Sequence, residues 1–273
     1  MPVELIALDL DDTLLRTDLT VSEANRAALA EARAAGIRVV LASGRNIHSM
    51  RHYARLLELE GPEDYLICSN GAEIIESATG RILDERRLAP ELCAEAARAI
   101  EERGFPWQIY EEGLIHVNRP NPWALEDSKL TGQPAILLED EEALFARGLI
   151  KFVVPGEPER IEGLRRELSA LFAGRAAVLT SKPYFLEVLA LGVDKGEALG
   201  RLSASLGIPM ERVMAVGDAM NDLGMVRAAG HGSAPANAIP AVKAAARHVA
   251  SRTNDEDAVA ELVRGVALAG RRG

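Results

Sequence analysis

Acidic side chains gather where the first apolar segment of the chain ends. Residues 3–9 are mostly apolar and end at Asp9, and Asp11 and Asp12 come directly after. Carboxylates can attack phosphorus, transfer protons and bind hard divalent cations, so a group of them indicates one of these chemistries. Alone the pattern is weak, because aspartate also forms turns and because an Asp-x-Asp pair can hold the metal of a nucleotide-sugar glycosyltransferase.

Further polar clusters lie at the ends of other apolar segments. Ser-Gly-Arg occupies 43–45, Ser-Asn-Gly occupies 69–71, and "GDAMND" occupies 217–222, while "DKGEAL" opens a predicted helix at Asp194. In an open parallel sheet, ligands bind beyond the carboxyl ends of the strands. We therefore expect these clusters to meet at one edge of a sheet.

The elements that must position these residues have two different patterns. Residues 3–71 read strand, helix, strand, helix, strand with nearly continuous apolar strands, and this rhythm returns from Asp194. A possible capping box at Thr20 and Glu23 opens the first helix. Such a pattern predicts an α/β fold, a doubly wound, Rossmann-like parallel sheet covered on both faces.

The intervening residues alternate more strongly between polar and apolar. They include two amphipathic helices, 90–103 and 158–171, and the proline-containing segment 118–134, which we expect to be irregular. This order predicts an α+β unit with an antiparallel sheet. We therefore expect a core at residues 1–83 plus 190–273 and an inserted α+β cap at 84–189.

Composition restricts the class of protein further. The 273 residues carry 31 Lys and Arg against 41 Asp and Glu, a formal net charge of -10, which argues against nucleic acid or an anionic membrane as partner. The two cysteines give no disulfide framework, and neither a signal peptide nor a membrane span is recognisable. We expect a soluble cytoplasmic protein, a monomer or weak homodimer.

Taken together, the motifs resemble those of the haloacid dehalogenase superfamily of phosphohydrolases. Its four motifs match "DLDDTL", "LASGR", "DKGEAL" and "GDAMND" in order. The Cof-like branch, which has a type IIB α+β cap, also matches "SNGA", "YFLEV" and the C-terminal "NDED". The resemblance extends over essentially the whole chain, with the cap between the second and third motifs.

The resemblance implies a role for each motif. Asp9 would be the nucleophile, and Asp11 would be the general acid and base, with its backbone carbonyl on a Mg²⁺ ion. Asp9, Asp218 and Asp222 would supply or support the other metal ligands. The implied phosphate-binding residues are Ser43, Gly44, Lys195 and Asn221. A helix beginning at Asp218 would place Asn221 and Asp222 on its face, three and four residues further on.

We accordingly predict a Mg²⁺-dependent phosphatase for a small phosphorylated metabolite, most plausibly a sugar phosphate, with an aspartyl-phosphate intermediate. A phosphotransferase such as a phosphohexomutase on the same fold is one alternative, and a non-catalytic metabolite-binding protein is another. Two roles stay open at this point. Arg45 either contacts substrate or braces its loop, and Asp12 is expected to be a turn or capping residue rather than a catalyst.

Overall fold

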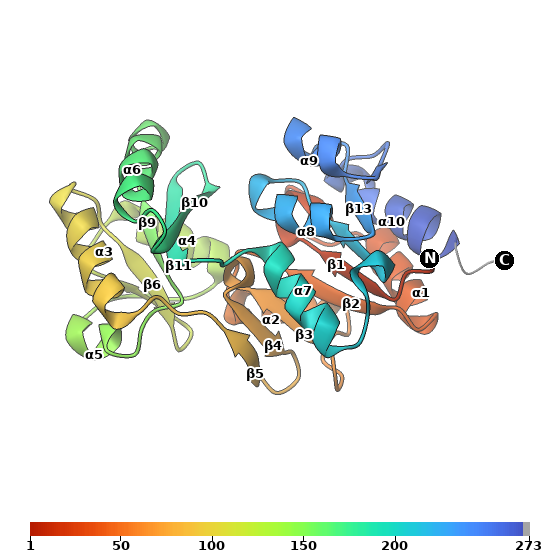
Figure 1. Cartoon of the computed structure of the whole chain (residues 1–273), viewed down its shortest axis with the longest axis horizontal. Coiled ribbons are helices and arrows are strands. Elements are labelled where there is room, and N and C mark those ends of the chain that lie inside the picture. Colours follow the sequence, from red (N-terminus) through yellow and green to blue (C-terminus); the bar gives the residue numbers. More distant parts are fainter. Residues whose placement is uncertain (270–273) are drawn as a thin grey trace. The chain divides into compact units, whose positions relative to one another are not determined.

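The chain forms two compact units, one inserted into the sequence of the other. The computed structural model describes residues 1–269. The first unit comprises Met1–Asp84 with Asp194–Gly273, and the second comprises Glu85–Val193. Figure 1 shows the two ends of the sequence, red to orange and teal to blue, sharing the first unit. Residues 270–273 of the predicted core segment lie outside the described residues.

The first unit is built on an eight-stranded sheet in the order β14-β13-β12-β1-β2-β3-β4-β5. The strands are β1 Leu5–Leu8, β2 Arg38–Ala42, β3 Tyr65–Cys68, β4 Glu73–Glu76, β5 Ile82–Glu85, β12 Val213–Val216, β13 His231–Ala234 and β14 His248–Val249. The central strand β1 pairs in parallel with β2 and β12, while β3 pairs with β4 in antiparallel fashion. All four side chains of β1 are buried, because the sheet is covered on both faces.

Helices from both ends of the sequence cover this sheet. The side chains of Ile6 and Leu8 share one apolar cluster with α1 (Glu23–Ala34), α2 (Ile47–Leu56) and α10 (Ala258–Leu262). Leu5 and Ala7 point to the other face and cluster with α7 (Lys195–Ser205), α8 (Leu223–Ala228) and α9 (Pro240–Ala245). Alternate side chains of one strand thus reach opposite faces, which confirms the predicted doubly wound α/β core.

The second unit is an α+β layer with its own core. Its six-stranded sheet has the order β10-β11-β9-β6-β7-β8. The strands are β6 Gln108–Glu111, β7 Leu114–Val117, β8 Ala135–Leu137, β9 Lys151–Pro155, β10 Ala176–Lys182 and β11 Phe185–Ala190. The helices α3 (Pro90–Glu102) and α6 (Pro158–Leu171) pack on one face around Trp107 and Phe152. These two helices were predicted at 90–103 and 158–171. A short helix, α5 (Glu141–Phe145), adds Phe145 to the same cluster.

Two local predictions are wrong. The segment 118–134 contains a helix, α4 (Pro122–Thr131), because Pro122 stands at its first turn, where proline needs no N–H partner, and Asn121 caps it. The first helix is capped by Ser22, whose side chain accepts a hydrogen bond from the Asn25 N–H, whereas Thr20 bonds to Asp18 instead. Asn121 caps α4 and Ser22 caps α1. In both places the local backbone conformation, and not residue type alone, determines which side chain caps the helix.

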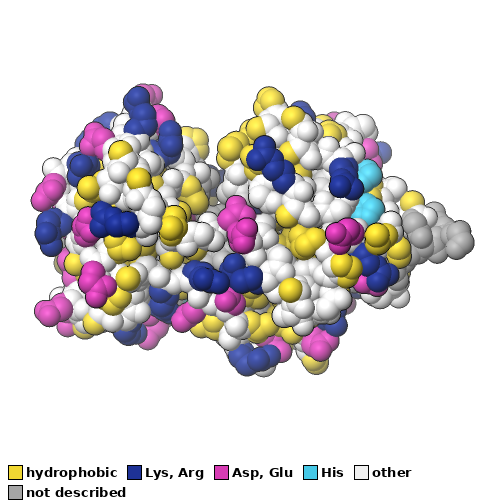
Figure 2. Space-filling view, in the orientation of Figure 1, with side chains coloured by type: hydrophobic (Ala, Val, Ile, Leu, Met, Phe, Trp, Pro, Cys, Tyr) yellow, Lys and Arg dark blue, Asp and Glu magenta, His cyan; other side chains and the backbone are white. Residues whose placement is uncertain are grey.

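Short turns complete the first unit. Single turns of 3-10 type lie at Ser69–Gly71, Met210–Arg212, Met220–Asp222 and Asn254–Glu256, and wider turns lie at Leu10–Leu14 and Val263–Ala267. Within residues 1–269, no helix is both long enough and apolar enough to cross a membrane. Figure 2 shows acidic and basic side chains interspersed over the visible face of each unit. Since the formal net charge is -10, an anionic ligand would be held by particular cations rather than by a broadly basic surface.

Candidate active site

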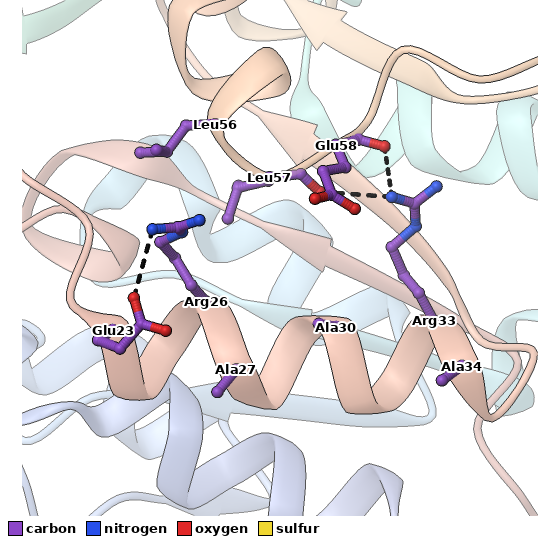
Figure 3. Close-up of a pocket in the computed structure, with 9 residues that line it drawn as sticks. All are labelled: Glu23, Arg26, Ala27, Ala30, Arg33, Ala34, Leu56, Leu57 and Glu58. Carbon is purple, nitrogen blue, oxygen red and sulfur yellow. Dashed lines mark hydrogen bonds and ion pairs between the residues drawn. The ribbon is translucent and has the colours of Figure 1, made fainter.

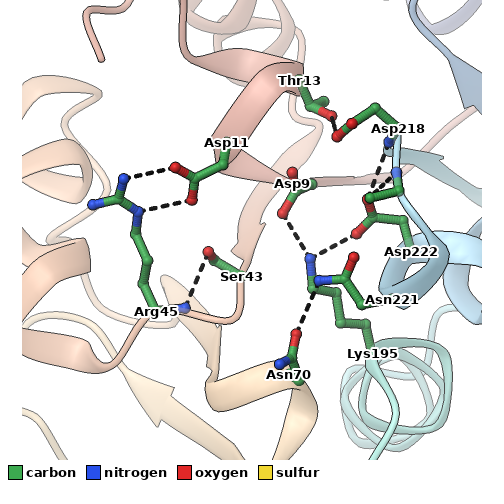
Figure 4. Close-up of polar contacts among 11 residues, drawn as sticks. Asp9, Asp11, Thr13, Ser43, Arg45, Asn70, Lys195, Asp218, Asn221 and Asp222 are labelled. Atoms are coloured by element: carbon green, nitrogen blue, oxygen red, sulfur yellow. Dashed lines mark hydrogen bonds and ion pairs between the residues drawn. The ribbon is translucent and has the colours of Figure 1, made fainter. Parts of the chain in front are cut away.

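The ends of the parallel strands bring the predicted residues of the first unit to one edge of the core sheet. Asp9 lies directly after β1 and Ser43 directly after β2, while Asp218 lies two residues beyond the end of β12. Lys195 occupies the first position of α7, which Asp194 caps by accepting the Gly196 and Glu197 N–H groups. Figure 4 shows these side chains directed toward one another from separate segments.

Lys195 forms the centre of the charge arrangement. Its Nζ lies 2.6 Å from Oδ1 of Asp9 and 2.6 Å from Oδ1 of Asp222, and its side chain is fully buried. Burial by itself lowers a lysine pKa, but the charges and hydrogen bonds of Asp222 and Asp9 outweigh it and raise the pKa of Lys195. Lys195 is therefore a permanent cation placed against the predicted nucleophile.

Asp222 is fully engaged by its neighbours. Its Oδ1 accepts from Lys195, and its Oδ2 accepts the backbone N–H groups of Asp218 and Ala219, each at 3.0 Å. The predicted helix starting at Asp218 is wrong, because a 3-10 turn covers Met220–Asp222 and α8 begins only at Leu223. Asp218 and Asp222 are instead brought together by these side-chain-to-backbone hydrogen bonds.

Three carboxylates form a group that suits a divalent cation. Each of Asp9, Asp218 and Asp222 offers an oxygen, and these three oxygens lie within 4.8 Å of one another. Burial and then the charge of Asp222 raise the pKa of Asp218 to about 7, and burial and Asp222 also raise the pKa of Asp9 well above its ordinary value. The single positive charge of Lys195 therefore does not balance the negative charges of the three carboxylates. All the donors are hard oxygens, so the group fits Mg²⁺.

Thr13 holds one of these carboxylates in place. Its Oγ1 donates to Oδ1 of Asp218 at 2.8 Å, and its side chain is fully buried. Thr13 lies in the turn Leu10–Leu14, in which Asp12 has a positive φ of 56°. Asn237 Nδ2 donates to the Asp12 carbonyl at 2.7 Å and so supports this uncommon backbone conformation. The geometry agrees with the expectation that Asp12 is a turn residue.

The Asp11 side chain is directed away from the three-carboxylate group. Figure 4 shows its carboxylate facing the Arg45 guanidinium, whereas Asp9 faces Lys195. Arg45 donates from Nε to Oδ2 at 2.9 Å and from Nη2 to Oδ1 at 2.7 Å. Sequence reasoning left the role of Arg45 open, since a motif gives no information about which carboxylate an arginine reaches.

Three of the predicted phosphate-binding residues, Ser43, Gly44 and Asn221, lie beside Asn70. The Ser43 Oγ accepts the Arg45 N–H at 3.2 Å, and the backbone N–H of Asn70 donates to the Ser43 carbonyl at 3.0 Å. Asn221 Nδ2 donates to Asn70 Oδ1 at 3.0 Å. A Cβ placed on Gly44 would lie 3.1 Å from that same oxygen, so the loop approaches Asn70 closely. Asn70 and Thr13 were missed as supporting residues, although both stand in motifs that the sequence singled out.

Comparison with known proteins gives the family. A model of haloacid dehalogenase-like hydrolases matches residues 6–263. The chain is 33% identical over 264 residues to the 5-amino-6-(5-phospho-D-ribitylamino)uracil phosphatase YcsE of Bacillus subtilis strain 168, covering 96% of this chain and 95% of that protein.

Solved structures agree in fold. A haloacid dehalogenase-like hydrolase from Bacteroides thetaiotaomicron has a TM-score of 0.89 and 30% identity, covering 97% of this chain and 99% of that one. A sugar phosphatase of subclass IIB of this superfamily has a TM-score of 0.79 at 23% identity, covering 96% and 98%.

The family match and the phosphatase relatives, which the chain covers over nearly their whole length, show a hydrolase of the phosphatase type. The chain belongs to the haloacid dehalogenase-like hydrolases. The predicted family and class of enzyme, a phosphoric monoester hydrolase, are thereby confirmed.

Proposed function

We propose that the enzyme hydrolyses the phosphate monoester of a small metabolite, a sugar phosphate, with Mg²⁺ and through an aspartyl-phosphate intermediate. The observation that carries this proposal is the group of Asp9, Asp218 and Asp222 around a buried Lys195. A carboxylate that approaches a phosphate dianion is repelled by about 4 kcal/mol for each pair of unit charges at ~4 Å and an effective dielectric constant of ~20. The reaction therefore needs positive charge at this position.

The oxygen ligands of the cation would come from three separate segments. Asp9 and Asp218 would bind through their carboxylates and Asp11 through its backbone carbonyl, while Asp222 would support the group by holding Lys195 and the Asp218 turn. When bound, Mg²⁺ neutralises carboxylate and phosphoryl charge so that the two anions can approach. Ser43, Gly44, Lys195 and Asn221 would bind the phosphoryl oxygens.

The first chemical step transfers the phosphoryl group to the protein. Oδ2 of Asp9 attacks phosphorus, since Oδ1 accepts the Lys195 hydrogen bond. The bond from phosphorus to the ester oxygen breaks, and its electron pair stays on that oxygen. The protonated Asp11 carboxyl gives its proton to the departing oxygen, so the alcohol leaves neutral and Asp11 becomes a carboxylate.

The second step regenerates the enzyme. The Asp11 carboxylate takes a proton from a water molecule as the water oxygen attacks the phosphorus of the aspartyl-phosphate. The bond from phosphorus to Oδ2 of Asp9 breaks and returns its electron pair to the Asp9 carboxylate. Inorganic phosphate is released, and Asp11 is again protonated for the next cycle.

The cap and the similarity to other phosphatases support a substrate class. An inserted cap favours small substrates, since closure of an active site over the ligand excludes water and obstructs macromolecules. The relative YcsE is named for a substrate with a phosphorylated ribityl chain. We therefore assign a phosphorylated sugar or polyol as the substrate class.

A metal-dependent assay tests this function. We expect p-nitrophenyl phosphate to be hydrolysed with Mg²⁺ but not after chelation with EDTA, and Asp9→Asn to lower turnover by at least ~10³-fold because its amide cannot serve as nucleophile. Retention of activity by Asp9→Asn would contradict the mechanism. A panel of sugar phosphates, with phosphate release measured against transfer to a second sugar, would distinguish a phosphatase from a phosphotransferase.

A further inference from the structure

The pairing of Arg45 with Asp11 is more specific than bracing a loop requires. Both carboxylate oxygens of Asp11 accept a hydrogen bond from the same guanidinium, at 2.9 and 2.7 Å. The side chains are largely buried, with 13% of Arg45 and 24% of Asp11 exposed. A two-point contact of this kind fixes the plane of a carboxylate as well as its position.

Arg45 is itself fixed by two other elements. Its guanidinium carbon lies 5.6 Å from the centroid of the Tyr53 ring on α2, and the Tyr53 hydroxyl donates to the Leu19 carbonyl at 3.2 Å. Its backbone carbonyl accepts the Ser69 N–H at 2.9 Å from the end of β3. These contacts hold the guanidinium in one orientation, with its Nε and Nη2 donors directed at Asp11.

We propose that Arg45 is a positioning residue that aligns the Asp11 carboxylate as the base of the second chemical step. This inference rests on the proposed function, because it assigns Asp11 to the activation of water. The arginine pairs with the ionised form of Asp11, which is the form that takes a proton from water as the aspartyl-phosphate is hydrolysed. The Asp11 side chain is also outside the three-carboxylate group, so Arg45 rather than that group orients the Asp11 carboxylate.

An activated aryl ester isolates this step. Dinitrophenolate leaves without protonation, so dinitrophenyl phosphate needs Asp11 only for hydrolysis of the intermediate. The ratio kcat/KM reports steps up to release of the first product, whereas kcat also includes that hydrolysis. We expect Arg45→Ala to lower kcat at least ~10-fold, as loss of an oriented base does, and to change kcat/KM by less than ~3-fold. Rapid mixing should show a burst of dinitrophenolate that approaches one equivalent of enzyme.

Two further variants separate the positioning effect of Arg45 from the effect of its charge and from a general loss of stability. Arg45→Lys keeps the charge but loses the two-point contact, so we expect it to restore kcat only in part. It also tests the proposal should Arg45→Ala fail to fold. Arg33→Ala is the control, since Arg33 on α1 is a similarly part-buried arginine that bonds to Asp64 and to the carbonyls of Leu57 and Glu58. Figure 3 shows Arg33 in the groove between α1 and the end of α2, and we expect Arg33→Ala to leave both constants unchanged.

A double-mutant cycle provides the decisive comparison. If Arg45 acts through Asp11, Arg45→Ala should have no further effect on kcat in the Asp11→Asn background. Equal losses of kcat and kcat/KM, an unchanged kcat, or a full effect of Arg45→Ala in Asp11→Asn would each overturn the inference while leaving the phosphatase function intact. Absence of Mg²⁺-dependent turnover in the unmodified enzyme would instead overturn the proposed function, and the inference with it.

Discussion

At the scale of single residues, Lys195 compensates the charges of two carboxylates in a position without exposed surface. An ion inside a protein is stable only when paired and hydrogen-bonded, because transfer from water removes its solvation. Asp9 and Asp222 supply those partners for Lys195, and Lys195 supplies theirs. Three residues proposed for the reaction thus also balance one another's buried charge.

Replacement of this lysine should destabilise the protein as well as inactivate it. We expect Lys195→Met to lower the free energy of unfolding by roughly 3–5 kcal/mol at neutral pH, because two buried carboxylates lose their cation. Urea unfolding measures the change. Lys129→Met is the matched control, since the Lys129 side chain is 62% exposed, and its loss should change stability by less than ~1 kcal/mol. Equal effects of the two substitutions would show that Lys195 is not needed for charge balance.

At the scale of elements, α7 and α8 approach each other through glycines. A Cβ on Gly196 would overlap the backbone of Gly224, and a Cβ on Gly224 would overlap the Asp194 carboxylate that caps α7. The first turn of α7, which carries Lys195, is therefore positioned by backbone contact between these helices. The sequence shows both glycines but not that they face each other.

This contact predicts that Gly224→Ala will reduce activity without unfolding the protein. The added methyl group must push Asp194 and the first turn of α7 away, and a displacement of about 1 Å at a catalytic group can reduce rate ~10²-fold. Phosphatase kinetics and thermal unfolding measure the two effects.

Gly200→Ala, on α7, is the control. A Cβ at Gly200 meets nothing within 4 Å, so we expect normal activity and a stability gain of up to about 1 kcal/mol. Normal kinetics for Gly224→Ala would contradict the proposed control of Lys195 by this contact.

At the scale of the whole molecule, stability depends on protonation of the carboxylate group. The pKa of Asp218 is about 7 in the folded protein, against an ordinary value of 3.8. Between these values the folded chain binds a proton that the unfolded chain releases, so stability must fall as pH rises through this window. The contribution amounts to about 4 kcal/mol between about pH 4 and 8.

We therefore expect the protein in EDTA to unfold at lower urea concentration at about pH 8 than at about pH 5. Saturating Mg²⁺ should remove most of this difference, because the cation binds the ionised, folded group. Comparison with Asp218→Asn isolates the share of Asp218. His48 and His231, whose pKa values are lowered by burial, act in the opposite sense in both proteins, while Asp9 and Asp127, whose pKa values are raised by burial, act in the same sense in both. A metal-free protein that is equally stable at both pH values, or whose pH dependence is not reduced by Asp218→Asn, would contradict the assignment.

Much of the fold could be predicted because its causes are local in sequence. Buried strands such as Leu5–Leu8 are continuous apolar runs, and a parallel sheet necessarily gathers at one edge the residues that come directly after its strands. The proximity of Asp218 and Asp222 was anticipated for the wrong reason, since hydrogen bonds to backbone N–H groups rather than a helix bring them together.

Side-chain pairing between distant segments could not be predicted. Arg45 and Asp11 are 34 positions apart, and Thr13 and Asp218 are 205 apart, so their contacts depend on the final register of the sheet and on side-chain rotamers. Residue type shows that an arginine can pair with a carboxylate, or a threonine with an aspartate. Which two residues pair is determined only in the folded structure, where the ends of the strands come together.

The insertion of one unit into the other also orders events during synthesis on the ribosome. The contact between Asp9 and Lys195 joins residues 186 positions apart, and Lys195 is made only after the whole segment Glu85–Val193 has been translated. A nascent chain that carries Asp9 thus lacks both the ammonium partner of Asp9 and β12, the parallel neighbour of β1. Translation products that stop short of Asp218 are consequently expected to be inert toward phosphate esters, so premature termination releases no uncontrolled hydrolase.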